Sequence, residues 1–368
     1  MDTTLRIAFD AKRAYHNSRG LGNYSRDTIR LLTHYAPENE YFYFGQPTDL
    51  FRPDCGTVVA PQGLWNALPA LWRSWGCLND LTKQKIDIYH GLSGELPFGI
   101  HYTAAKTLVT MHDTIFVRYP ELYSPTYRRL FARKVQYACD HATRIIAISE
   151  QTKQDLVQFF HADETKISVV YQGCNNRFRM PVSEEEMKAA RAKYGLPERY
   201  IIDVGAIEPR KNMQRLLYAM AEAHIDLPLV AVGGKSKYAE QMRALATRLG
   251  VRLIMLHGVN FADFPALYKG AECLVYPSLY EGFGIPILEA MCVGTPVLTS
   301  TGSCFEETGG EAALYADPND PIAIGLQLQR LLTDKALRAD LVERGKRQAE
   351  KFSDEAVAHN LLEVYHTL

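Results

Sequence analysis

ECLVYPSLYEGFGIPILEA, residues 272–290, joins an apolar run to a glycine-containing loop and then to a second apolar run. The first run, ECLVYPS (272–278), is apolar on both faces, which is typical of a strand buried in a parallel sheet. Pro286 suits the first turn of a helix, where its missing N–H would have had no acceptor. The stretch therefore predicts a strand, a loop at its carboxyl end and a helix that stops near Gly294.

Similar apolar runs recur along the chain and alternate with amphipathic stretches such as 124–142 and 212–224. Strand–helix alternation is typical of βαβ units in doubly wound sheets. The predicted strands form two series: 5–11, 40–45, 86–91, 106–113, 143–149 and 166–173, then 200–207, 227–234, 252–259, 272–278 and 296–300.

The polar, charged stretch 174–200 separates the two series and is predicted to be a domain junction. We therefore expect an α/β protein with two Rossmann-like domains, each a doubly wound parallel sheet. Ligands of open α/β sheets bind beyond the carboxyl ends of the strands. Two such domains facing each other would form a central cleft at those ends.

The composition of the chain excludes several classes of partner. The 41 Lys and Arg residues balance 42 Asp and Glu residues, so no nucleic acid partner is expected. No apolar run approaches the ~20 residues that span a bilayer, and the first residues lack a signal-peptide core. The seven cysteines are scattered without a CxxC pattern. We expect a cytoplasmic protein.

The start of the predicted helix offers an anion site. Free backbone N–H groups at Gly284 and Ile285, aided by the helix dipole, fit a phosphate. Glu281 and Glu289 would repel a phosphate but accept hydrogen bonds from vicinal hydroxyls. A nucleotide sugar, with a diphosphate between two hydroxyl-bearing rings, satisfies both features. The alternative is an ordinary helix start, where glutamates are favoured by the dipole alone.

The cations for such a ligand are expected in GAIEPRKN (205–212), which follows the first strand of the second series. Arg210 and Lys211 stand where they could meet a diphosphate and neutralise the charge of the leaving group. No DxD-type run lies in a plausible metal-binding loop, so no metal is predicted. The alternative is a solvated pair of loop cations.

These motifs resemble, in order along the chain, those of the retaining glycosyltransferases with the GT-B fold, family four or glycosyl transferases group 1. EGFGIPILEA is similar to the E-x7-E signature of that family, and GAIEPRKN is similar to its phosphate-binding loop. DAKRAYHNSRGLGNY (10–24) resembles the N-terminal glycine-containing loop of the family. The mannosyltransferase-like branch is resembled in YHGLSGELP (89–97), TMHDTIFVRYPE (110–121), AISEQTKQDL (147–156) and VVYQGCNNRF (169–178), and HGVNFADFPALYKGAECLVYPSLYEGFG (257–284) completes the series.

The resemblance implies roles for particular residues. Glu289 would bind the ribose hydroxyls, and Glu281 would contact the donor sugar near the reacting carbon. Arg210 and Lys211 would hold the diphosphate, and His112 would lie near the donor sugar. His112 could instead be a satisfied core histidine. Further donor contacts are implied for Gly22, Gly205, Val259, Phe283, Gly284 and Ile285.

The resemblance also implies that the last helix crosses back to the first domain. The expected domains are an acceptor-side domain of residues 1–175 with 352–368, and a donor-binding domain of residues 176–351.

The implied reaction transfers a hexose, with retention, to a hydroxyl of a saccharide or lipid-linked saccharide. The setting would be cell-surface polysaccharide or lipopolysaccharide synthesis. The expected donor is GDP-mannose, and no cofactor or metal is expected. A UDP-sugar-dependent transferase, a phosphorylase or epimerase of the same fold, and a non-catalytic nucleotide-sugar-binding protein stay open. A dinucleotide-dependent dehydrogenase fits poorly, because Ser25 occupies the third glycine position of its fingerprint in GLGNYS (20–25).

All three tryptophans lie in 63–85, together with Arg73, Lys83 and Lys85. One interpretation is docking at the inner face of the plasma membrane or on a lipid-linked saccharide. The other, which we favour, is an amphipathic core helix with its charged face in water.

Overall fold

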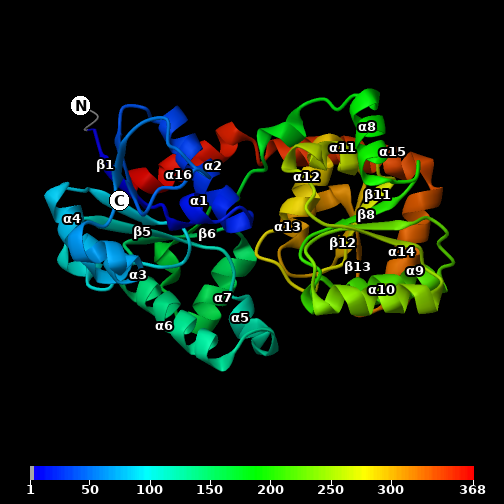
Figure 1. Cartoon of the computed structure of the whole chain (residues 1–368), viewed down its shortest axis with the longest axis horizontal. Coiled ribbons are helices and arrows are strands. Elements are labelled where there is room, and N and C mark those ends of the chain that lie inside the picture. The colour runs from blue at the N-terminus through cyan, green and yellow to red at the C-terminus, as the bar shows by residue number, and fades with distance from the viewer. Residues whose placement is uncertain (1–3) are drawn as a thin grey trace. The chain divides into compact units, whose positions relative to one another are not determined.

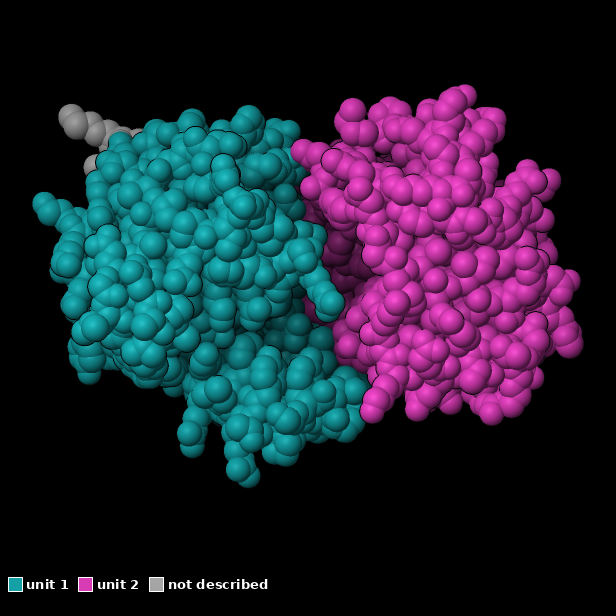
Figure 2. Space-filling model, in the orientation of Figure 1, with its two compact units in different colours: residues 1–172, 354–368 teal, residues 173–353 magenta. Residues whose placement is uncertain are grey.

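The computed structural model describes residues 4–368, and the chain divides into two compact units (Figures 1 and 2). Unit 1 comprises Met1–Gln172 and Asp354–Leu368, and unit 2 comprises Gly173–Ser353. The last helix, α16 (Asp354–His366), therefore belongs to the same unit as the N-terminal part of the chain, and Figure 1 shows it beside α2 (Gly20–Tyr35).

Unit 1 is built on a seven-stranded parallel sheet in the order β3-β2-β1-β4-β5-β6-β7. Its strands are β1 (Arg6–Asp10), β2 (Glu40–Phe44), β3 (Thr57–Val59), β4 (Ile88–Gly91), β5 (Lys106–Met111), β6 (Arg144–Ala147) and β7 (Ile167–Val169). Its helices are α1 (Lys12–His16), α2 (Gly20–Tyr35), α3 (Pro69–Leu71), α4 (Cys77–Lys83), α5 (Ile115–Arg118), α6 (Pro125–His141), α7 (Glu150–Phe160) and α16 (Asp354–His366).

Unit 2 is built on a six-stranded parallel sheet in the order β10-β9-β8-β11-β12-β13. Its strands are β8 (Ile201–Val204), β9 (Leu229–Val232), β10 (Leu253–Leu256), β11 (Cys273–Tyr276), β12 (Val297–Ser300) and β13 (Ala313–Ala316). Its helices are α8 (Glu184–Tyr194), α9 (Met213–Glu222), α10 (Lys237–Leu249), α11 (Phe264–Lys269), α12 (Ile285–Val293), α13 (Phe305–Gly309), α14 (Pro321–Thr333) and α15 (Lys335–Glu350).

The predicted fold class is confirmed: each unit is a doubly wound α/β layer structure with an all-parallel sheet. Each predicted strand is present, because fully buried strands read as continuous apolar runs. Two edge strands, β3 and β13, were not predicted from the sequence. β3 has only three residues and is largely exposed, so it gives no recognisable apolar run. β13 is the short run ALYA, and its two middle residues are only partly buried.

The tryptophan-containing segment 63–85 contributes to both core and surface. Trp72 is buried, stacks on Phe44 and donates its indole N–H to Asp80. Trp65 and Trp75 are exposed. The segment therefore does not form one amphipathic helix with all its aromatic rings inside. Among residues 4–368, no helix has the length and apolar character needed to cross a membrane.

Candidate active site

The order of strands in unit 2 reverses between β8 and β11, which pair side by side. The loops that leave the carboxyl ends of these two strands diverge to opposite sides of the sheet, which is where open α/β sheets bind ligands. Several hydrogen bonds tie the loops together. The Leu279 N–H donates to the Arg210 carbonyl at 2.9 Å, and the side-chain amide of Asn212 donates to the Pro277 carbonyl at 3.0 Å.

Glu281 lies in the loop after β11 and meets both cations of the loop after β8. Its Oε1 is 2.7 Å from an Nη of Arg210 and 2.7 Å from the Nζ of Lys211. Lys211 also donates to the Tyr276 hydroxyl at 2.6 Å, and Arg210 pairs with Glu208 at 2.7 Å. Two cations from the loop after β8 therefore converge on one carboxylate oxygen from the loop after β11.

The cations beside Glu281 determine the charge of its carboxylate. Glu281 is only 8% exposed, so burial works against its ionisation. Lys211 and Arg210 outweigh that penalty and lower the pKa of Glu281 to about 2. Glu281 in turn keeps the pKa of Arg210 above its ordinary value, against burial. Glu281 and Arg210 are therefore charged near neutral pH.

The backbone of Glu281 is anchored from the loop after β12. Its N–H donates to the Ser303 hydroxyl at 3.3 Å, and the same hydroxyl donates to the Glu281 carbonyl at 3.1 Å. The Cys304 thiol is directed at that carbonyl as well, at 3.3 Å. Three loops, after β8, β11 and β12, thus determine where the carboxylate lies.

α12 begins directly after this loop, as the sequence predicts. Gly284 precedes the helix with φ +99°, a conformation that favours glycine, and Pro286 lies in the first turn. The helix ends at Gly294, also with positive φ. The first N–H groups of a helix have no acceptor inside it, so the start of α12 presents donors at the same switch point.

Glu289 lies one turn inside α12. Its Oε2 accepts a hydrogen bond from the Tyr268 hydroxyl at 2.7 Å, which leaves Oε1 for another donor. Burial raises the pKa of Glu289 to about 7, although the Tyr268 hydroxyl works in the opposite direction. Glu281 and Glu289 therefore have opposite electrostatic environments, one beside two cations and one in a low-dielectric setting.

The other predicted donor residues of unit 2 have distinct surroundings. The Phe283 side chain is buried against Phe352, so only its backbone faces the loop. Gly205 has φ +153°, and a Cβ there would lie 3.3 Å from the Cε of Lys211. Val259 is half-buried in the segment that follows β10.

His112 and Gly22 belong to unit 1. The His112 Nε2 lies 2.9 Å from the Leu92 carbonyl, and burial lowers the pKa of His112 to about 4. The ring is therefore neutral at pH 7, carries its proton on Nε2 and leaves Nδ1 as an acceptor. A Cβ on Gly22 would lie 1.7 Å from the carbonyl oxygen of Asn17, the residue that follows α1, so close packing of α2 against the end of α1 already requires this glycine.

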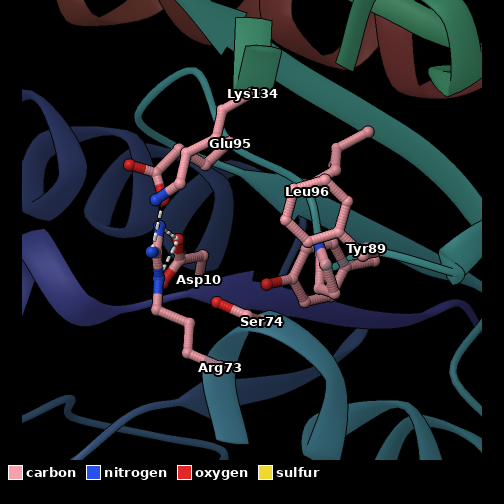
Figure 3. Close-up of a pocket in the computed structure, with 9 residues that line it drawn as sticks. Asp10, Arg73, Ser74, Tyr89, Glu95, Leu96 and Lys134 are labelled. Carbon is pink, nitrogen blue, oxygen red and sulfur yellow. Dashed lines mark hydrogen bonds and ion pairs between the residues drawn. The ribbon is translucent and has the colours of Figure 1, made fainter. Parts of the chain in front are cut away.

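A second charged cluster lies at the carboxyl end of β1 in unit 1. Figure 3 shows Asp10, Arg73, Glu95 and Lys134 converging beside a small cavity. The cavity has room for about one water molecule. The Arg73 Nε is 2.9 Å from Asp10, Arg73 also pairs with Glu95, and Lys134 is 3.2 Å from Glu95. Two cations and two carboxylates compensate each other, so Asp10 and Arg73 have a clear structural role.

Three residues of the site, Tyr276, Asn212 and Tyr268, were not predicted from the sequence. Tyr276 ends β11 and receives Lys211, Asn212 joins the two loops, and Tyr268 holds Glu289. Tyr276 alone carried a signal, because it is the last residue of a strand that precedes a candidate ligand loop.

Comparison with known proteins agrees with this arrangement. Residues 19–177 match the family described as Glycosyltransferase Family 4, and residues 186–348 match the family described as Glycosyl transferases group 1. The O-antigen chain mannosyltransferase B of Escherichia coli is 31% identical over 296 residues, which cover 78% of this chain and 76% of that protein. The chain belongs to the group 1, family 4 glycosyltransferases.

This glycosyltransferase has further relatives. The serotype-specific mannosyltransferase WbdA of Escherichia coli is 30% identical over 275 residues, which cover 72% of this chain but only 34% of that protein. Anabaena HepE, solved in complex with UDP and glucose, superposes with a TM-score of 0.77 at 18% identity, over 99% of this chain and 100% of that chain. The likeness to HepE establishes the GT-B fold, and family 4 is a retaining family.

Proposed function

We propose that this glycosyltransferase moves a mannosyl group from GDP-mannose, with retention, to a hydroxyl of a saccharide or lipid-linked saccharide in cell-surface polysaccharide synthesis. The observation that carries the proposal is the convergence of Arg210 and Lys211 on Glu281, each at 2.7 Å, at the switch point of unit 2. The mannose assignment is supported by the two Escherichia coli relatives, which are both named mannosyltransferases.

Arg210 and Lys211 would hold the donor diphosphate. Both side chains are mostly buried and held by neighbours, so little ordering entropy is lost when a phosphate arrives. The N–H groups at the start of α12, around Gly284 and Ile285, would receive another phosphate oxygen. Glu281 keeps Arg210 and Lys211 in place while the site is unliganded, because its negative charge offsets the repulsion between the two cations.

The chemistry follows from where charge develops. As the bond from the sugar to the phosphate breaks, negative charge grows on the leaving diphosphate, and Arg210 and Lys211 stabilise it. Positive charge grows at the sugar, and the ionised Glu281 lies beside it. The acceptor hydroxyl attacks from the same face, and its proton passes to a phosphate oxygen. Because the pKa of Glu281 is about 2, this carboxylate is a poor base and stays anionic.

Glu289 would bind the ribose diol of the donor. Its Oε2 is already occupied by Tyr268, and its Oε1 can accept from a hydroxyl. Val259 would lie near the base, Gly205 would leave room beside Lys211, and Phe283 would contribute backbone contacts. His112 and Gly22 would contact the sugar and phosphate from unit 1.

We propose that the reaction needs no metal ion. A divalent cation commonly neutralises the diphosphate of a nucleotide sugar, and here two fixed cations, Arg210 and Lys211, supply the same total charge. Activity in the presence of a chelator tests this point.

A cytoplasmic enzyme in peripheral contact with the inner face of the plasma membrane fits the surface of segment 63–85. Trp65 and Trp75 are exposed there, and so are Lys83 and Lys85. Exposed aromatic rings next to lysines are typical of surfaces that bind anionic lipid. Sedimentation with anionic and neutral vesicles distinguishes such binding from none.

A UDP-sugar donor is the second candidate, because HepE was solved with UDP and glucose. Slow hydrolysis of each donor without acceptor decides between them. GDP-mannose, GDP-fucose, UDP-glucose and UDP-GlcNAc would be compared in EDTA, with wild type, Glu281→Ala and the surface control Glu311→Gln. We expect turnover of GDP-mannose that is lost only in Glu281→Ala. Nucleotide binding without any turnover would instead favour a non-catalytic binding protein.

A further inference from the structure

A continuous chain of buried polar contacts runs through unit 1 from its C-terminal helix to His112. The Tyr365 hydroxyl on α16 lies 2.7 Å from the His90 Nδ1, and the His90 Nε2 lies 2.8 Å from the Thr110 hydroxyl. The Thr110 hydroxyl lies 3.0 Å from the Tyr24 hydroxyl on α2. Tyr365, His90, Thr110 and Tyr24 are here called the positioning chain.

The positioning chain ends against the His112 ring. The Tyr24 ring meets His112 edge-on, with ring centroids 4.6 Å apart and planes at 90°. A second contact also holds the His112 ring: its Nε2 lies 2.9 Å from the Leu92 carbonyl oxygen. One bond and one ring contact therefore fix the orientation of the imidazole, and the ring contact depends on where the Tyr24 hydroxyl is held.

The members of the chain are deeply buried, with exposures of 3% for Tyr365, 0% for His90 and Thr110, and 8% for Tyr24. Burial lowers the pKa of His90 to about 3, so its ring is neutral. A neutral imidazole donates from one nitrogen and accepts at the other. The proton positions of Tyr365 and Thr110 are therefore linked through His90, and loss of one end disturbs the other.

Stability alone does not account for such a chain. Well-packed apolar residues in place of buried polar partners are often neutral or stabilising, whereas a partly satisfied network is costly. A four-member polar chain that links two neighbouring helices, α16 and α2, through strands β4 and β5 is better suited to holding a geometry.

We propose that Tyr365, His90, Thr110 and Tyr24 are positioning residues that hold the His112 imidazole in its working orientation. The C-terminal helix α16 then acts on the site through Tyr365, 253 positions along the chain from His112. The proposal rests on the proposed function in one respect, the role of His112 beside the donor sugar. It also assigns a role to His90 and Tyr24, two residues in motifs that the donor contacts leave unexplained.

The test compares Tyr365→Phe with Tyr41→Phe in the full chain. Tyr41 is 3% exposed, and its hydroxyl bonds the Leu32 and Ala36 carbonyls at 2.7 Å each, outside the positioning chain. Both variants lose one buried hydroxyl in unit 1, so their melting temperatures should fall alike. Donor kcat and KM would be measured together with the imidazole nitrogen signals of His112.

We expect Tyr365→Phe to lower kcat roughly three- to tenfold, the effect of one buried hydrogen bond, with donor KM unchanged. The His112 signals should shift in Tyr365→Phe and stay in place in Tyr41→Phe. Equal kcat values and equal His112 signals in the two variants would overturn the proposal.

A second matched pair serves if Tyr365→Phe fails to fold. Thr110→Val removes the centre of the positioning chain, and Thr107→Val makes the same change three residues earlier in β5, where the hydroxyl bonds the His141 carbonyl at 3.1 Å. The same contrast is expected. If wild type turns over no donor, the proposed function fails, and the His112 signals alone decide on the positioning chain.

Discussion

The Nζ of Lys211 and the Oε1 of Glu281 lie 2.7 Å apart, although 70 positions separate the two residues in the chain. Both side chains are nearly buried, with exposures of 12% and 11%. Arg210 approaches the same oxygen at the same distance. A carboxylate between two buried cations is therefore both a structural support and the expected centre of the donor site.

Glu281→Gln should separate these two roles. The substitution leaves Lys211 without its counter-ion and leaves Arg210 with Glu208 alone, which costs roughly 3 kcal/mol of unfolding free energy. Urea unfolding measures that loss, and GDP should restore more stability to the variant than to wild type, because the diphosphate replaces the missing charge. Donor turnover should fall at least ~100-fold. Glu311→Gln, at a side chain that is 93% exposed, should change neither quantity.

Lys211→Met should impair chemistry more than nucleoside recognition. Loss of one cation at the leaving group typically costs about 100-fold in kcat. Lys235→Met, in the exposed segment after β9, is the matched control and should behave as wild type. Steady-state kinetics with GDP-mannose would measure both. An unchanged kcat in Lys211→Met would assign the leaving-group charge to other residues.

Glu289 should make stability pH-dependent in a defined window. Its pKa is about 7 in the folded chain against 4.5 as the ordinary value, so the folded state binds this proton more tightly. Stability should therefore fall as pH rises from 4.5 towards 7, by at most about 1.4 kcal/mol per pH unit. Urea unfolding of Glu289→Gln across this range should show a smaller fall. A fall equal to that of wild type would mean that Glu289 is ionised throughout.

The main effect expected of Gly22→Ala is a loss of stability in unit 1, independent of any ligand. The new Cβ would lie 1.7 Å from the Asn17 carbonyl oxygen, so the backbone must shift, at a cost of roughly 3 kcal/mol. Gly20→Ala is the control in the same helix, because no atom lies within 4 Å of its added Cβ. Thermal unfolding should show a large drop for Gly22→Ala only. Equal melting temperatures for Gly22→Ala and Gly20→Ala would contradict this packing argument. Close approach of the donor phosphate would then explain why residue 22 is glycine.

The sequence was sufficient to predict the fold because buried parallel strands and capped helices have local signatures. ECLVYPS and Pro286 predicted β11 and the start of α12 within a few residues. β3 was missed because it is an exposed three-residue edge strand, held by pairing to β2 and not by its own composition.

Contacts between distant segments could not be predicted in the same way. The pairing of Glu281 with Lys211 depends on β8 lying next to β11, which only the sheet order reveals. Tyr268, which bonds Glu289, comes from a different helix, α11. In the same way, which tryptophans are buried and which are exposed depends on how segment 63–85 turns.

Calorimetric binding of GDP and of guanosine tests the central claim, that Arg210 and Lys211 form the diphosphate site of the donor. Wild type and Arg210→Gln would be compared, with Lys235→Gln as the control for a lost surface cation. We predict that wild type binds GDP far more tightly than guanosine and that Arg210→Gln loses most of this difference while guanosine binding stays the same. The claim is contradicted if Arg210→Gln binds GDP as tightly as wild type does.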